Sequence, residues 1–108
     1  MNNKRIKQLI ELVKENPKDA FLYYCLFLEY LKNNDNINTE KILEKLWEDF
    51  SDYLPAYYQI AKYYEKKGDD DYALKAYVKG IVLAKKLKDD HTLSELQREY
   101  EFLLEDMM

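Results

Sequence analysis

Few side chains in this sequence belong to the types that carry nucleophilic or acid–base chemistry. Cys25 is the only cysteine and His91 the only histidine. A reactive thiolate needs a neighbouring base or cation, whereas Cys25 lies in an apolar stretch, which is typical of a small buried side chain. His91 follows two aspartates at an expected turn, which is typical of a solvated residue. The sequence therefore contains no Cys–His pair for catalysis, and a single cysteine excludes an intrachain disulfide.

Two polar clusters have the composition of a calcium-binding loop but not its spacing. An EF-hand loop needs oxygen ligands at alternate positions, a central glycine and a closing glutamate. Residues 69–71 are consecutive aspartates, while the alternating asparagines of 34–38 are followed by Thr39 in place of the glycine and Lys45 in place of the glutamate. We interpret both clusters as turns and helix caps, so we expect no metal and no cofactor. Because glycine-rich phosphate loops and nucleophile motifs are also absent from the sequence, we expect that the protein is not an enzyme.

The charge balance argues against a nucleic-acid partner. The formal net charge is -4 and the basic residues alternate with Glu and Asp, whereas affinity for phosphates comes from clustered Lys and Arg. No apolar stretch approaches the length of a membrane span, and the first residues lack the apolar core and cleavage site of a signal peptide. We therefore expect a cytoplasmic protein that does not bind membranes.

The most apolar stretch is AFLYYCLFLEYL, residues 20–31, in which Glu29 is the only charged residue. A surface helix has one apolar stripe, whereas a helix that is apolar on every side belongs in the interior. The composition therefore predicts that this helix is the one around which its neighbours pack.

Apolar spacing and boundary residues predict five further helices. In each segment the apolar residues recur three or four positions apart, as on one helix face. Asn16-Pro17 ends the first helix, Asp19 caps the second, Pro55 opens the fourth, and Gly68 closes it as a left-handed cap. The predicted helices are 4–15, 20–31, 39–50, 54–67, 70–87 and a sixth after residue 90. For this last helix we expect a capping box of Thr92 and Glu95 and fraying over 106–108.

The sequence repeats itself when it is shifted by 34 residues. The shift pairs aromatic with aromatic residues and turn with turn residues, without a gap. The aligned pairs include Tyr23 with Tyr57, Leu26 with Ile60, Tyr30 with Tyr64, Asn34 with Gly68, and Asp35 with Asp69. A period of this length indicates a repeating helix–turn–helix unit.

The second unit resembles the tetratricopeptide repeat. Its residues Tyr57-x2-Ile60-Ala61-x2-Tyr64, followed by Gly68 and Ala73-x3-Tyr77, are similar to the signature of that family. The resemblance implies an all-α fold, an α-solenoid of about six antiparallel helices in which two helix hairpins are flanked by an N-terminal helix and a C-terminal capping helix. It also implies a single domain, 1–108, made of a half-repeat helix at 1–19, a degenerate repeat at 20–53, a second repeat at 54–87 and the cap at 88–108.

The degenerate first repeat differs from the second at three positions that the family keeps small. These positions are Ala61, Ala73 and Gly80 in the second repeat, and Phe27, Thr39 and Leu46 in the first. We therefore expect the first helix pair to be further apart or tilted. At Gly80 we expect a close helix crossing, where alanine is tolerated if there is room for one methyl group and leucine is not.

The resemblance implies a protein-binding module in which the first helix of each repeat lines a concave groove for a peptide or helix of a partner protein. The groove residues that it implies are Phe21, Tyr24, Leu28, Leu31, Tyr58, Lys62 and Glu65. Two alternatives stay open from the sequence. The first or last helix covers these side chains, or the same apolar surface joins copies of the chain in a homo-oligomer.

Overall fold

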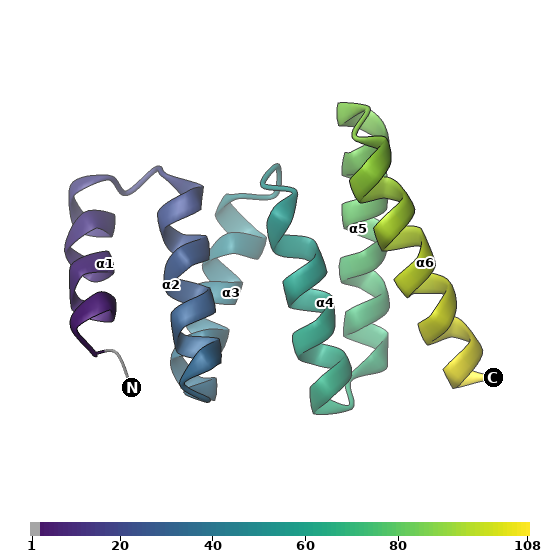
Figure 1. The fold of residues 1–108 in the computed structure, drawn as a ribbon, viewed down its shortest axis with the longest axis horizontal. Helices are drawn as coiled ribbons and strands as arrows, with labels where there is room; N and C mark the ends of the chain where they lie inside the picture. Colours follow the sequence, from purple (N-terminus) through teal and green to yellow (C-terminus); the bar gives the residue numbers. More distant parts are fainter. Residues whose placement is uncertain (1–2) are drawn as a thin grey trace. The chain divides into compact units, whose positions relative to one another are not determined.

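The computed structural model describes residues 3–108, and this part of the chain is helical without strands. Six helices follow one another in sequence (Figure 1). They are α1 (Asn3–Glu15), α2 (Ala20–Lys32), α3 (Asn36–Asp49), α4 (Pro55–Lys67), α5 (Asp70–Leu87) and α6 (Asp90–Met107). The predicted all-α class is confirmed.

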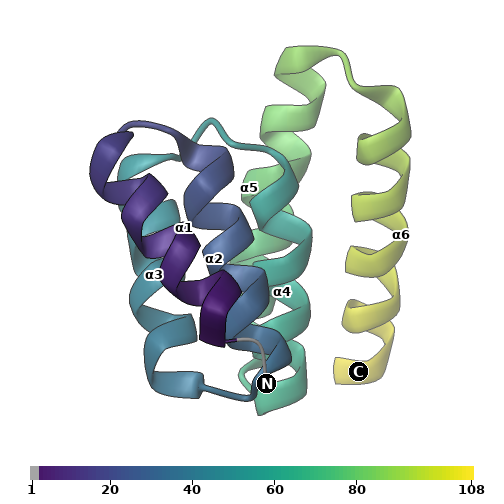
Figure 2. The same ribbon diagram turned by 60° about the vertical axis from the view of Figure 1, so that its left-hand side comes forward.

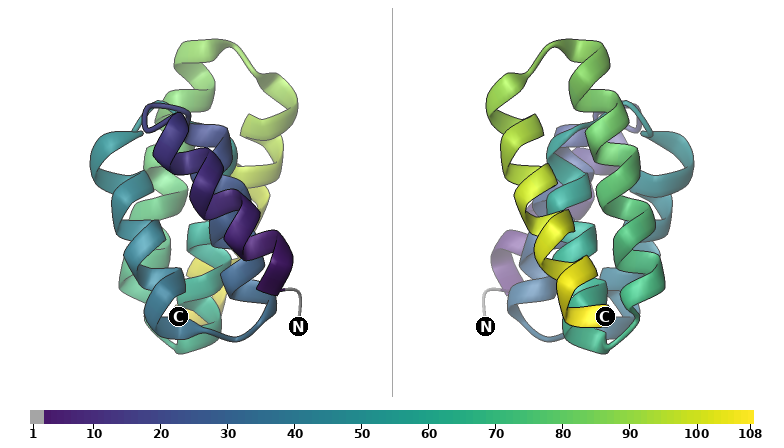
Figure 3. Two further views of the ribbon diagram at one scale, coloured as in Figure 1. Left: turned by 90° about the vertical axis from the view of Figure 1, so that its left-hand side faces the viewer. Right: turned by 90° about the vertical axis from the view of Figure 1, so that its right-hand side faces the viewer.

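The helices form two compact units, residues 1–53 and 54–108. In the first unit α2 packs against both α1 and α3. Figure 2 shows α1 lying across α2, joined to it by a short turn. In the second unit α5 packs against both α4 and α6, and Figure 3 shows α5 and α6 side by side. Each unit is therefore a helix hairpin with one additional helix.

The turns inside the two hairpins have the same backbone geometry, as the 34-residue alignment predicts. Asn34 and Gly68 both have positive φ angles, 58° and 86°. The following residues, Asp35 and Asp69, are both N-caps whose carboxylates accept a backbone N–H three residues later at 3.1 Å. Gly68 suits the left-handed conformation because it has no Cβ, and asparagine is among the few other residues that adopt it readily.

Three predicted helix ends are wrong. Helix α3 begins at Asn36 rather than at Thr39, because Asp35 caps it. Helix α6 is capped by Asp89, which accepts the backbone N–H of Thr92, so Thr92 and Glu95 do not form a capping box. The same helix extends to Met107 instead of fraying from residue 106. The sequence also predicts that Asn2 or Asn3 caps the first helix, but Asn2 and the side chain of Asn3 lie outside what the structure describes.

Helix α2 is less buried than its composition predicts. Only Tyr23, Leu26 and Phe27 are buried in α2, whereas α4 and α5 each have five buried residues. Phe21 is 57% exposed. The expectation of a wholly interior helix is therefore wrong, and α2 keeps apolar surface outside the core.

The three positions that differ between the repeats are buried in both. Phe27 and Thr39 are 0% exposed, as are their counterparts Ala61 and Ala73. Leu46 is 1% exposed and its counterpart, Gly80, is also buried. The two hairpins therefore bury equivalent positions with side chains of different size.

Candidate functional site

The first candidate surface begins at the amino-terminal end of α2. Asp19 caps this helix by accepting the backbone N–H of Phe21 at 3.0 Å. The hydroxyl group of Tyr23 donates to the carbonyl of Pro17 at 3.2 Å, which connects the α1–α2 turn to α2. These contacts fix the turn, and Phe21 lies exposed in the first turn of the helix.

A surface hollow of about 650 Å³ adjoins Phe21. The α1–α2 turn and the beginning of α2 line it, together with one residue that follows α3. The lining residues are Asn16, Pro17, Lys18, Asp19, Ala20, Phe21 and Tyr53. A concave surface lined by aromatic and proline side chains is suited to hold an apolar group of a ligand.

The aromatic residues beside this hollow contact one another. The Tyr24 ring lies 5.5 Å from the Tyr53 ring and 6.5 Å from the Phe27 ring, measured between centroids. Burial raises the pKa of Tyr53, so its hydroxyl group remains protonated at neutral pH. Tyr24 is thus held in place by its neighbours and half-buried, whereas Phe21 extends further into solvent.

Further along α2, helix α1 approaches the predicted groove residues. Arg5 of α1 forms an ion pair with Glu29 of α2 at 3.1 Å, and Leu28 and Leu31 are half-buried. Cys25 is also half-buried, and burial is the main cause that raises the pKa of its thiol. The structure thus supports reading Cys25 as an unreactive side chain, although it is less buried than predicted.

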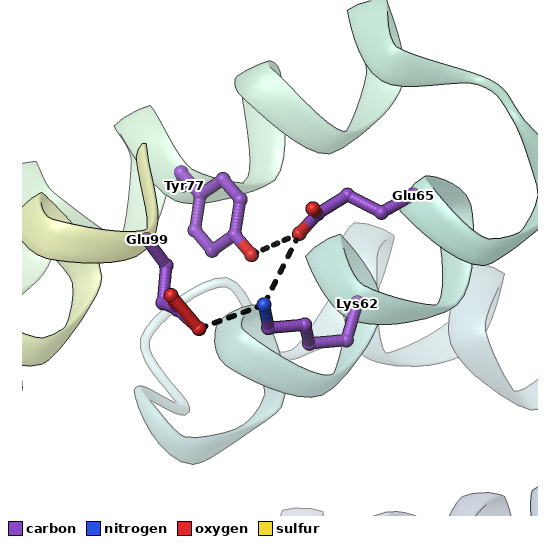
Figure 4. Close-up of polar contacts among 4 residues, drawn as sticks. All are labelled: Lys62, Glu65, Tyr77 and Glu99. Carbon is purple, nitrogen blue, oxygen red and sulfur yellow. Dashed lines mark hydrogen bonds and ion pairs between the residues drawn. The ribbon is translucent and has the colours of Figure 1, made fainter. Parts of the chain in front are cut away.

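In the second unit, two of the predicted groove residues belong to a polar network (Figure 4). Lys62 Nζ lies 2.8 Å from Glu99 Oε1 of α6 and 3.5 Å from Glu65 Oε2. The Tyr77 hydroxyl group of α5 donates to the same oxygen of Glu65. Lys62 Nζ also lies 5.6 Å from the centroid of the Tyr58 ring. The network connects all three helices of the unit.

The charges in this network favour the protonated forms of its lysine and tyrosine. Burial lowers the pKa of Lys62, but the hydrogen bond to Glu99 and the charges of Glu65 and Glu99 outweigh it, so the pKa is raised. Burial and the hydrogen bond to Glu65 raise the pKa of Tyr77. Neither group is therefore prepared to act as a base at neutral pH, and the arrangement is suited to holding α4, α5 and α6 together.

The sequence predicted some of these residues as site residues and missed others. Tyr77 and Glu99 were not predicted as partners of the α4 side chains, and no sequence signal relates Lys62 to a residue on α6. Tyr53 was also missed at the hollow. The available sequence signal for the hollow was Pro17 in the α1–α2 turn, because a proline in a turn fixes the backbone.

The described residues, 3–108, contain neither a candidate metal site nor a candidate membrane span. No three His, Cys, Asp or Glu side chains gather there as a metal site would require. None of the six helices is both long enough and apolar enough to cross a bilayer.

Comparison with known proteins identifies the fold. No protein-family model matches the chain, and no curated protein matches it. The solution NMR structure of a tetratricopeptide repeat domain protein from Salinibacter ruber is similar, with a TM-score of 0.75 and 33% sequence identity over 81% of this chain and 88% of the other. Folds of this type generally mediate protein–protein interactions and are typically non-enzymatic. With the 34-residue helical repeat and its matching turns, this similarity shows that the chain belongs to the tetratricopeptide repeat family.

Proposed function

We propose that the protein is a non-enzymatic protein-binding module that receives a peptide or helix of a partner protein along α2. Phe21, Tyr24, Leu28 and Leu31 make the apolar contacts. Phe21 enters a pocket of the partner, and an apolar side chain of the partner enters the hollow beside Phe21 and Tyr53.

The incomplete burial of α2 carries this proposal. An aromatic side chain is costly to leave in water, and Phe21 is 57% exposed on the most apolar helix of the chain. Buried aromatic anchors supply a large share of binding energy at protein interfaces. The exposed ring and the adjacent hollow therefore offer the two parts of such a contact, an anchor and a pocket.

The equivalent helix of the second repeat, α4, contributes differently. Lys62 and Glu65 already hold Glu99 and Tyr77, so a partner uses their charges only by replacing these contacts. The half-buried Tyr58 is the α4 residue best suited to an apolar contact with a partner. In this proposal α4 therefore has a smaller part than α2.

The proposal is tested by selecting binders from a random peptide library displayed on phage, with the 108-residue chain as the target. We expect enriched peptides to share an apolar or aromatic position. Synthetic copies should bind Phe21→Ser about tenfold more weakly than the unchanged chain, because truncation removes the anchor. Ile37→Ser is the matched control, since Ile37 is 74% exposed on α3 and lies outside the hollow.

Equal affinity of the enriched peptides for the Phe21→Ser and Ile37→Ser chains would overturn the proposal. Homo-oligomerisation through the same surface is the alternative, and sedimentation velocity over a range of concentrations distinguishes it. A mass that rises with concentration for the unchanged chain but not for Phe21→Ser would assign the surface to a second copy.

A further inference from the structure

The exposed apolar surface of α2 is concentrated at its amino-terminal end. Phe21 is 57% exposed, and no other large apolar residue of α2 is exposed to a comparable extent. Leu28 and Leu31 lie about two and three turns further along the helix and are half-buried. A partner helix in a groove needs anchors over several turns, and along α2 it would meet an exposed apolar side chain only at one end. The hollow beside Phe21 is therefore where a partner gains most apolar contact.

The lining of this hollow combines apolar rings with balanced charge. Pro17, Phe21 and Tyr53 contribute a proline ring and two aromatic rings to a space of about 650 Å³. Lys18 and Asp19 also line it, and their charges have opposite signs. A strongly acidic or basic segment therefore has no advantage here, and the hollow favours an uncharged apolar group that packs against rings.

The Tyr53 side chain adds a hydrogen-bond donor to this lining. Its ring lies 5.5 Å from the Tyr24 ring, but its hydroxyl group forms no hydrogen bond within residues 3–108. Thr39 Oγ1 is the only buried side-chain nitrogen or oxygen without a partner in this part of the chain, so the Tyr53 hydroxyl is reached by solvent. Burial of the residue raises the pKa of Tyr53, so the group stays protonated at neutral pH. A partner in the hollow therefore meets a donor that it can bind with an acceptor of its own.

Backbone carbonyls are the most abundant acceptors of a partner protein, and its conformation decides whether they are available. In an α-helix nearly all carbonyls are bonded within the helix. A partner strand adds to the edge of a sheet, and residues 3–108 contain no strand. A polyproline II segment has no internal hydrogen bonds, so every carbonyl along it remains an acceptor. Such a segment matches both the rings and the donor of the hollow.

We propose that the hollow binds a proline-rich segment of a partner protein in the polyproline II conformation, an inference that rests on the proposed role of α2 in binding a partner. A proline ring of the segment packs against Phe21 and Tyr53, and the Tyr53 hydroxyl group donates to a carbonyl of the same segment. Because each proline already fixes its φ angle, the segment loses little conformational entropy when it binds. Aromatic-lined grooves recognise such segments in several unrelated domains.

The test selects binders of the 108-residue chain from two peptide libraries displayed on phage. One library has prolines fixed three positions apart, which places them on the same face of a polyproline II helix, and random residues elsewhere. The other library has the apolar spacing of an amphipathic α-helix and contains no proline. We expect the proline library to yield the tighter binders. Replacing the fixed prolines by alanine in synthetic copies should weaken binding about tenfold.

Substitutions in the chain then locate the bound peptide. Tyr53→Phe removes only the hydroxyl group and should weaken binding about fivefold, the effect of one lost hydrogen bond. Phe21→Ser should weaken it about tenfold. Tyr100→Phe is the matched control, since Tyr100 is a half-buried tyrosine of α6 whose hydroxyl group also forms no hydrogen bond within the described chain. Fluorescence polarisation measures each affinity, and thermal melts show that each variant is folded.

Three outcomes would overturn the inference. Tight binders from the helix library alone, with an affinity that Phe21→Ser lowers, would leave the proposed function in place and contradict polyproline II recognition. A proline-library peptide that binds Tyr53→Phe as tightly as the unchanged chain would contradict the hydrogen bond that the inference requires. If neither library yields a peptide whose binding depends on Phe21, both the inference and the proposed function are wrong.

Discussion

Tyr57 and Gly80 lie so close together that a Cβ atom built on Gly80 would be 2.9 Å from the Tyr57 Cβ atom. The same Cβ would be 2.9 Å from Leu96 Cδ1 of α6. The Leu96 methyl group lies at the end of a flexible side chain, but the Tyr57 Cβ is fixed to the backbone of α4. The glycine therefore sets how closely α4 approaches α5 in the second repeat, which confirms the predicted close crossing.

Gly80→Ala should destabilise the protein. The sequence-based expectation is that alanine is tolerated only if the crossing leaves room for one methyl group, and the two 2.9 Å contacts leave no such room. Alanine gains about 1 kcal/mol of helix propensity. Overpacking costs about 1–3 kcal/mol, and the fixed Tyr57 Cβ leaves little room to relax. We expect a net loss for alanine and a larger loss for leucine, measured as midpoints of urea denaturation. An alanine variant as stable as the parent would mean that α4 moves away from α5 at little cost in free energy of unfolding.

Thr39→Val should stabilise the protein by about 1 kcal/mol. Thr39 is 0% exposed, and its Oγ1 has no hydrogen-bond partner among the described residues. Valine replaces the hydroxyl group by a methyl group of similar size, so the cost of burying an unpaired polar group disappears. Its counterpart in the second repeat is the apolar Ala73.

Thr92→Val is the matched control for this substitution. The Thr92 hydroxyl group donates to Asp89 Oδ2 at 2.9 Å, so valine should destabilise the protein at this position. If both threonine-to-valine substitutions move the midpoint of urea denaturation in the same direction, burial of an unpaired hydroxyl does not explain the effect at Thr39.

The repeat made much of the fold predictable from the sequence. Asn34 and Gly68 are different residues, yet the alignment paired them and both adopt the left-handed conformation. Local chemistry explains this success, because capping and turn formation depend on a few neighbouring residues. The start of α3 was nevertheless misplaced, because residues 34–38 were interpreted as turns and helix caps without identifying Asp35 as the residue that caps α3.

The candidate site was less predictable because its contacts join distant residues. Lys62 and Glu65 fitted the groove positions of the family, but whether they are available depends on Glu99, 34 residues further along the chain than Glu65. Burial of α2 also depends on how its neighbours pack. Its apolar composition predicted an interior helix, whereas packing leaves Phe21 exposed.

The N-cap aspartates should make stability depend on pH in the acidic range. Hydrogen bonds from the Asn38 side chain and backbone lower the pKa of Asp35, and those from the Thr92 backbone and hydroxyl group lower the pKa of Asp89. A folded pKa below the unfolded value of 3.8 means that the unfolded chain binds more protons near that pH. The stabilisation is therefore present above pH 3.8 and is lost as the pH falls through the lowered values.

Asn substitutions at Asp35 and Asp89 isolate the contribution of charge, because asparagine is also a good N-cap residue. The double variant should be less stable than the parent at neutral pH. The difference in stability should shrink as the pH falls and the two aspartates of the parent become protonated. Thermal melts from pH 7 to pH 2 measure this convergence. A constant difference across the range would show that the effect comes from geometry and not from ionisation.

Lys62→Glu should destabilise the second unit, because it would place three carboxylates together where Lys62 now lies between Glu65 and Glu99. Lys62→Met removes the charge but keeps much of the aliphatic stem, so it should cost less, about 1 kcal/mol. The double variant Lys62→Glu/Glu99→Lys exchanges the charges across the 2.8 Å contact and should recover part of the loss. Lys66→Glu is the control, since Lys66 is exposed and has no recorded ion pair within the described chain. The midpoints of urea denaturation of the four variants measure these effects. If the double variant is no more stable than Lys62→Glu alone, the contact between α4 and α6 does not depend on this ion pair.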